Sequence, residues 1–432
     1  MRRRCRPSAC RTPTDARARA VVEHSPAPRP ARLGPLAEPQ FRRLYLARAF
    51  SLFGDALVPV ALAFAVLAVD RSPTALGFVL ASRFVSLLVF LLVGGVIGDR
   101  LSRKGVLIAS DLVRFGAQSI TAWLLITAQA MVWELVALAF VYGMGEAFFR
   151  PTSTGFVPET VSQARLQQAN ALLAMTTSTW TVVGPVIAGV MVTTVGAGWA
   201  IGVDALTFLV SSLFVWQIRT SRPLPRREST FFRDLAEGWQ VFTSQTWLWV
   251  DGVFSAISNC VVLAPLLALG PVVALRSLGG APSWATIVAA LGIGSTLGGL
   301  ALLRVTPSRP LLLGVPLLAL LAFPTALLAV PAPTVVIAVG AFAGGFGLAV
   351  FNTLFETTVQ HHVAPDALSR VSSIDWLMSV GLFPFGLAIA GPAAAAFGVR
   401  LPLVIASVWI VASTLIVLAV PSVRHIRLVR SR

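Results

Sequence analysis

Two opposite charges lie deep inside apolar stretches of the sequence, at Asp55 and Arg83. Counted at about 1.5 Å per helical residue from the ends of these stretches, the two positions differ in height by roughly 6 Å, which an arginine side chain can span. A charge at membrane depth is costly and therefore suggests a function. We expect a buried ion pair near the middle of a membrane, with Asp55 binding and releasing a proton. A static pair that only fixes two helices is the alternative.

Two asparagines, Asn259 and Asn352, lie in apolar stretches of the second half of the chain. Binding cavities for small organic molecules are mostly apolar, with a few polar groups that fix orientation. We expect these amides to face such a cavity together with Asp55 and Arg83.

A further group of charged residues lies near the ends of the apolar stretches, at the depth of the cytoplasmic third. The first half contributes Asp99, Arg100, Arg103, Asp111, Arg114, Glu146 and Arg150, and the second half contributes Glu356, Arg370 and Asp375. Their similar depth predicts ion pairs between the halves, which would act as a gate on the cytoplasmic side. The alternative is that some of these pairs only orient helices.

Long apolar helices must position these charges. The chain of 432 residues is 56% hydrophobic and only 12% charged, unlike a soluble domain of this length. A window of about 19 residues indicates about twelve membrane spans. We therefore expect an all-α membrane protein with about twelve transmembrane helices in two six-helix bundles. The predicted spans are 44–69, 75–98, 106–128, 132–150, 169–195, 199–218, 248–275, 284–303, 311–330, 335–360, 371–397 and 401–420.

Arginines are concentrated on one set of the loops between these spans, including 100–104, 219–233 and 424–432. The positive-inside rule then predicts that both termini are cytoplasmic and that the protein lies in the plasma membrane as a multi-pass protein. The net charge of +16 is thereby explained without a nucleic-acid partner. The partners we expect are the lipid bilayer, a small-molecule substrate and protons, and the protein is expected to be a monomer.

Five regions follow from this pattern: a disordered basic tail at 1–40, a six-helix bundle at 41–218, a cytoplasmic linker at 219–247, a second bundle at 248–421 and a basic cytoplasmic tail at 422–432. The tail at 1–40 lacks the apolar block of a secretory signal peptide. Within the linker, Phe231, Leu235, Trp239 and Phe242 recur at helical spacing, which predicts an interfacial helix. A solvated loop is the alternative.

Several kinds of chemistry are not supported by the sequence. The sole lysine, Lys104, is not part of a P-loop, so direct use of ATP within this chain is not expected. His361 and His362 stand together without a cysteine partner, which favours interfacial residues over a metal site. No nucleophile, base and orienting group can be placed together, so an enzyme, a cofactor and a metal ion are not expected.

Gly184, Pro185 and Gly189 lie within one predicted span. Proline removes a backbone donor and glycine permits close approach, so this helix is predicted to bend against a neighbour. The segment 184–189 resembles the core of the antiporter motif of drug-exporting members of the major facilitator superfamily.

The loop from Gly95 to Lys104 resembles the loop between helices two and three of the same superfamily, with Asp99, Arg100 and Arg103 in matching positions. Ser102 replaces the usual glycine. The resemblance implies that Asp99 caps a helix of the opposite half, near Val371, and joins an arginine network when the transporter faces outward.

Further resemblance covers nearly all of 40–420. Segments 51–56, 149–152, 169–172 and 364–366, with Arg370, look like the branch of macrolide-efflux and siderophore-exporting proteins. This resemblance implies export of a small amphiphilic organic molecule, of drug, macrolide or siderophore type, by proton antiport through alternating access. A proton-coupled uptake symporter and a non-transporting scaffold or sensor that retains the fold remain alternatives.

Overall fold

A computed structural model describes residues 34–427 except 101, 220–230, 304, 306, 331 and 365–366, and it describes no side chains at 92–100, 231–236 and 369. Within these ranges every regular element is a helix. Asp99 and Arg100 thus lie outside the described side chains.

The first half of the chain forms six long helices that pack on one another. Their bounds are α1 Pro39–Val69, α2 Pro73–Arg100, α3 Arg103–Ile126, α4 Val132–Thr160, α5 Leu166–Thr194 and α6 Ala197–Trp216. α1 packs on α5 and α6, α2 packs on α4, and α3 lies between α4 and α6. At the start of α3, Ser102 Oγ accepts a hydrogen bond from the backbone N–H of Gly105 at 3.2 Å, which satisfies one of the free donors of the first turn.

The second half begins with α7 Phe231–Ser244 and contains three interrupted helices. A π-helical turn, Asn259–Leu263, joins α8 Thr246–Ser258 to α9 Ala264–Val273, and a second such turn, Ala274–Leu278, follows α9. A 3-10 turn, Ala319–Leu321, joins α11 Pro310–Leu318 to α12 Ala322–Ala329, and Leu382 separates α14 Leu368–Gly381 from α15 Phe383–Phe397. The remaining helices are α10 Ala281–Ala301, α13 Thr334–His362, α16 Arg400–Ala419 and α17 Pro421–His425.

Eleven helical segments of the described chain are long and apolar enough to cross a membrane. α3 is a further long helix, and it falls outside that count because Asp111, Arg114 and Gln118 lower its hydropathy. The expected fold class, an all-α membrane protein, is confirmed.

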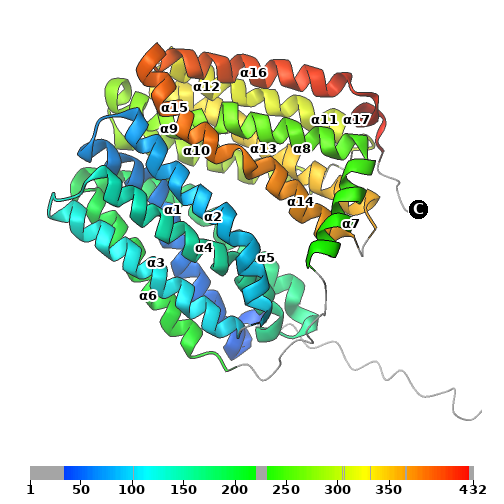
Figure 1. Cartoon of the computed structure of the whole chain (residues 1–432), viewed down its shortest axis with the longest axis horizontal. Helices are drawn as coiled ribbons and strands as arrows, with labels where there is room; N and C mark the ends of the chain where they lie inside the picture. The colour runs from blue at the N-terminus through cyan, green and yellow to red at the C-terminus, as the bar shows by residue number, and fades with distance from the viewer. Residues whose placement is uncertain are drawn as a thin grey trace, which may run out of the picture.

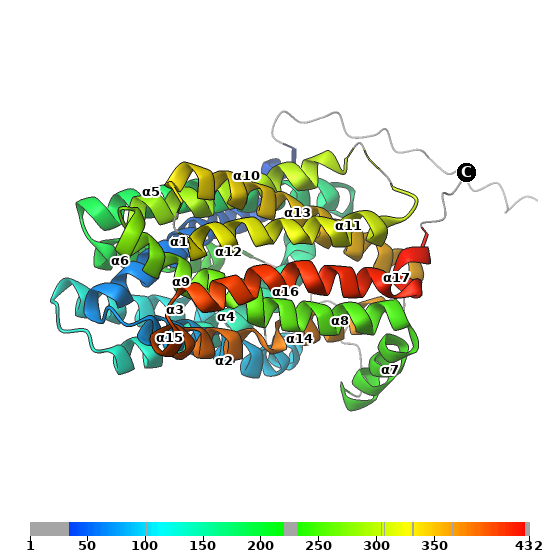
Figure 2. The ribbon, with the colours of Figure 1, turned by 90° about the horizontal axis from the view of Figure 1, so that it is seen from above.

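The two halves lie side by side and touch mainly at one end. We name the end of the molecule where α1 begins and α16 ends the terminal end, and the opposite end of the molecule the far end. Near the far end, the first turns of α2 meet α15, and the second half of α5 meets α10. These two seams lie on opposite sides of the molecule (Figure 2). Toward the terminal end the ribbons of α2 and α14 diverge (Figure 1).

Glycines bring the helices together at both seams. A Cβ atom on Gly391 would collide with the Cα atom of Thr74, and a Cβ on Gly189 would lie 2.6 Å from the Cβ of Ala285. Small residues of this kind allow membrane helices to pack backbone against backbone.

The described chain departs from the predicted tail at its start. Gly34–Ala37 forms a 3-10 turn before α1, and Arg165 donates a hydrogen bond to the Gly34 carbonyl at 3.2 Å. Residues 34–40 therefore belong with the first six helices, whereas residues 1–33 lie outside the described ranges.

The expected helix between the halves is present as α7. Its Phe242 is buried and its Trp239 is 48% exposed. A Cβ on Gly238 would lie 2.9 Å from the Cβ of Arg370, so α7 packs closely on α14. The alternative of a solvated loop is wrong for these residues, and the position of α7 at a membrane interface stays a prediction.

Candidate functional site

Five helices of the first half bring ionisable side chains into one region, which we name the charge cluster. Its members are Asp55 on α1, Arg83 on α2, Asp111 and Arg114 on α3, Tyr142 and Glu146 on α4, and Asp204 on α6. Most of these side chains are buried, which is the arrangement expected of functional groups inside a membrane protein.

Asp55 connects the cluster to the surface. Tyr142 Oη donates a hydrogen bond to its Oδ1 at 2.5 Å, and Arg114 lies 3.8 Å from its Oδ2. The Asp55 side chain is 30% exposed, whereas that of Arg114 is 1% exposed. Asp55 is thus the accessible member of an otherwise buried group.

The predicted pair between Asp55 and Arg83 does not form. Arg83 instead binds Glu146, with its Nε and terminal nitrogen 3.0 and 2.9 Å from Oε2. Gly143 explains why Arg83 pairs with Glu146. A Cβ atom at position 143 would collide with the Arg83 carbonyl, so the lack of a side chain at Gly143 allows α2 to pack close to α4. The Arg83 guanidinium then lies 4.6 Å from the centre of the Tyr142 ring, so Tyr142 stands between Arg83 and Asp55.

Arg114 is held from several sides. It donates to Asp111 on its own helix, a pair three residues apart. Its guanidinium lies 4.1 and 4.2 Å from the ring centres of Phe149 and Phe208, where cation–π attraction is strong because water is excluded. Ser211 completes the arrangement by donating to Asp111 Oδ2 at 2.7 Å.

Asp204 lies near the start of α6, where a carboxylate could remain hydrated in a membrane protein. Its exposed fraction is nevertheless 0%. The enclosure comes from α1 and α3, which cover α6 at this level. Gln118 Nε2 donates to Asp204 Oδ2 at 2.5 Å.

Several described members of the predicted gate have a partner within their own half. Glu146 accepts hydrogen bonds from Arg150 at 2.9 and 2.5 Å, and Arg103 lies 2.8 Å from Glu159. In the second half, Arg370 reaches Glu237 of α7 at 2.9 Å. The halves diverge at the terminal end in this conformation, and pairing of the gate residues across the halves stays a prediction.

The remaining predicted residues of the second half are spread over three helices. Asn259 donates to the Ser379 carbonyl at 2.8 Å, next to the break between α14 and α15. Asn352 and Glu356 on α13 are exposed. Asp375 is half-buried, and its Oδ1 is buried without a hydrogen-bond partner.

The predicted bending segment serves close packing on two sides. α5 is continuous through the buried Pro185. A Cβ on Gly184 would collide with that of Ala56 on α1, while Gly189 faces α10 across the seam already described. Gly184 thus tightens the first half, and Gly189 joins it to the second.

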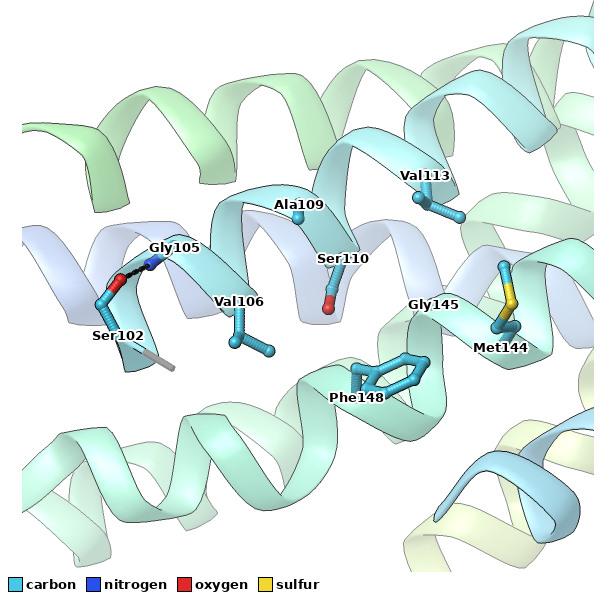
Figure 3. A pocket seen from close by; sticks show the side chains of 9 residues that line it. All are labelled: Ser102, Gly105, Val106, Ala109, Ser110, Val113, Met144, Gly145 and Phe148. Atoms are coloured by element: carbon cyan, nitrogen blue, oxygen red, sulfur yellow. Dashed lines mark hydrogen bonds between the residues drawn. The ribbon is translucent and has the colours of Figure 1, made fainter. Parts of the chain in front are cut away.

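A pocket of about 420 Å³ lies between α3 and α4 (Figure 3). Val106 and Val113 line it from α3, and Met144 and Phe148 line it from α4. It contains none of the four residues expected to line a midplane cavity. A much smaller space of about 10 Å³ lies beside Arg83, Gln118 and Tyr142, within the charge cluster.

Sequence reasoning missed two polar members of the site, Tyr142 and Gln118. The spacing of both residues from charged neighbours on the same helix could have indicated them. Tyr142 lies four residues before Glu146, and Gln118 lies four residues after Arg114, so each shares a helix face with a charged residue. Asp251 on α8, which is 3% exposed, was missed as well.

Long apolar helices in two adjoining halves, with charges buried among them, define a multi-pass membrane transporter. Residues 30–428 match the family described as transmembrane secretion effector, and the chain belongs to this family of the major facilitator superfamily. It is a transporter and not an enzyme.

Two kinds of curated relative are similar to this chain. It is 24% identical to macrolide efflux protein A of Streptococcus pyogenes over 61% of this chain and 66% of that protein. It is 25% identical to the enterobactin exporter EntS of Citrobacter koseri over 61% of this chain and 62% of that protein. The matches thus span less than two thirds of either relative.

Solved structures share the fold. The nucleoside transporter NupG aligns with a TM-score of 0.69 at 14% identity, covering 88% of this chain and 98% of that one. A bacterial homologue of the human lysosomal transporter Spinster, in an inward-facing and unoccupied conformation, aligns with a TM-score of 0.70 at 16% identity, covering 89% and 96%.

Proposed function

We propose that this transporter exports a small amphiphilic organic molecule through the cell membrane in exchange for protons, with both termini in the cytoplasm. The observation that carries the proposal is the position of Asp55, which is 30% exposed while Arg114 and Tyr142, its two partners, are buried. A carboxylate that joins an accessible surface to a buried network can exchange protons from one side at a time.

The direction of transport rests on the relatives. Both curated proteins described above are named as an efflux protein or an exporter. The arginine-rich loops favour a cytoplasmic terminal end. With that orientation, contact between the halves at the far end supports an inward-facing conformation, ready to take up cargo from the cytoplasm.

The gate is also part of the proposal. Arg150 is 54% exposed at the terminal end, Glu356 is exposed, and Asp375 Oδ1 is buried without a hydrogen-bond partner among the described residues. When the terminal end closes, these opposite charges would meet across the halves. Asp99, Arg100 and Arg103 would join them from the loop between α2 and α3.

Transport in proteoliposomes tests the function, with erythromycin as a macrolide probe. We expect counterflow of erythromycin at equal pH, and movement against the proton flow when a pH gradient is imposed. Movement in the same direction as protons would establish a symporter. Absence of counterflow with both erythromycin and enterobactin would favour the scaffold.

Asp55→Asn tests proton coupling, because it removes the titrating group while nearly preserving shape. We expect loss of pH-driven flux in a variant that remains folded by size-exclusion chromatography, with exchange at equal pH retained. Asp70→Asn, at an exposed carboxylate just after α1, is the matched control. Full pH-driven accumulation by folded Asp55→Asn would leave Asp55 with a structural role only.

A further inference from the structure

Asp204 is the one carboxylate among the described members of the charge cluster that contacts no guanidinium. Asp55 and Asp111 both face Arg114, and Glu146 binds Arg83. Asp204 Oδ2 accepts a hydrogen bond from the neutral side-chain amide of Gln118. Its other oxygen, Oδ1, is buried and has no hydrogen-bond donor.

Among the described residues of the helices packed on α6, no cation forms an ion pair with this carboxyl. α1 presents Asp55, which is itself a carboxyl group, and Arg48 of the same helix lies over the Phe149 ring at 5.3 Å. α3 presents Asp111 and Arg114, which bind each other. α5 has no charged residue within its bounds, Leu166–Thr194.

Two groups of the charge cluster lie on helices farther from Asp204. Arg83 on α2 is bound by Glu146, and Tyr142 on α4 gives its hydroxyl hydrogen to Asp55. No described side chain is therefore available to balance an ionised carboxylate at this position. An isolated buried charge is among the costliest arrangements in a protein interior.

The surroundings of Oδ1 are compatible with a hydrogen bound to that oxygen. A Cβ added to Gly54 of α1 would meet both Asp204 Oδ1 and Thr207 Oγ1, so these two oxygens border the gap that glycine leaves. Thr207 donates its hydrogen to the backbone carbonyl of Asp204 at 2.6 Å, which leaves the lone pairs of Oγ1 free to accept. Oδ1 and Oγ1 thus lie beside the same point of α1, and the Gln118 amide would continue to donate to Oδ2 if Oδ1 carried a hydrogen.

We propose that Asp204 is a proton-binding site inside the first half, reached from the surface through Asp55. The second part rests on the proton antiport proposed above, whereas proton binding at Asp204 does not. Asp55, partly exposed and one residue after Gly54, would take the proton from water. Asp204 would hold it out of contact with water.

Infrared spectroscopy of the purified protein tests the site without any substrate. A protonated carboxyl group gives a carbonyl band that is separate from carboxylate bands and shifts on exchange into D₂O. We expect the difference between wild-type and Asp204→Asn spectra at pH 7 to contain this band. Asp55→Asn, the matched control, is expected to retain it. A difference spectrum without this band, or loss of the band in Asp55→Asn, would overturn the proposal.

Gln118→Met provides a second test should Asp204→Asn not fold. Removing the amide donor from Oδ2 weakens the hydrogen bond to the carbonyl group, so the same band is expected at a higher frequency. An unchanged frequency in folded Gln118→Met would also overturn the assignment. If wild-type protein shows the Asp204 band but no pH-driven transport of erythromycin, proton antiport fails while the proton site stands.

Discussion

Tyr142 Oη lies 2.5 Å from Asp55 Oδ1. The same aromatic ring carries the Arg83 guanidinium on its face at 4.6 Å. One side chain of α4 therefore holds a carboxylate of α1 and a cation of α2 apart, and each of these charges finds another partner.

Tyr142→Phe removes the hydroxyl and keeps the ring. A hydrogen bond to a charged group contributes about 1.5–3 kcal/mol, so the variant should unfold at a lower temperature in detergent and lose part of its pH-driven flux. Tyr45→Phe is the control, because Tyr45 bonds the neutral Thr176 hydroxyl at 3.1 Å and lies outside the charge cluster. Equal effects of both substitutions would argue against a special role for Tyr142.

The two cations that bind Glu146 should differ in their contribution to stability. Arg83→Met is expected to destabilise the fold by about 3–5 kcal/mol, as for a broken buried pair, because the Arg83 side chain is 16% exposed. Arg150→Met should cost less than about 1 kcal/mol, since that side chain is 54% exposed. Thermal unfolding of both variants in the same detergent makes the comparison. The reverse order would show that Arg150 is the main partner.

The seam between α2 and α15 predicts a conformational effect of Gly391→Ala. The added methyl group would press on the backbone of Thr74 and should open the far end. Gly299→Ala is the control, because a Cβ there meets nothing within 4 Å. Spin labels at Thr154 and Ser372, both exposed near the terminal end, should move closer in Gly391→Ala only. An unchanged distance would mean that this seam does not set the conformational balance.

The orientation in the membrane is tested by cysteine labelling. Gln129→Cys lies at the far end and Ser308→Cys at the terminal end, and both positions are exposed. In a variant lacking Cys5, Cys10 and Cys260, an impermeant thiol reagent should label Gln129→Cys from outside the cell and Ser308→Cys only after the membrane is opened. The opposite pattern would reverse the topology.

Sequence predicted the helices better than the partners of their charges. Apolar length is a property of one segment, so the spans followed from counting residues. Counting also gave the depth of Asp55 and Arg83. Which residues these two side chains contact depends on the rotation of each helix about its axis, and on Gly143, which allows α4 to approach α2 closely. Asp204 shows the same limit, since its distance from a helix end says nothing about the cover that α1 and α3 provide.

The predicted gate illustrates a different limit. Pairs between the halves depend on which conformation the transporter adopts, and one sequence encodes more than one. In the conformation described, Arg103 and Arg370 use partners in their own halves.

The ion pair within α3 bears on how the chain is built into the bilayer during synthesis. Each charged residue at the centre of a helix costs a few kcal/mol on insertion through the translocon. The polar partners of α3 on α6 are Ser211 and Asp204, and they are translated about a hundred residues after Asp111. Asp111 and Arg114 are one turn apart and bind each other. The charges of the least apolar long helix of the first half can therefore neutralise one another before α6 leaves the ribosome.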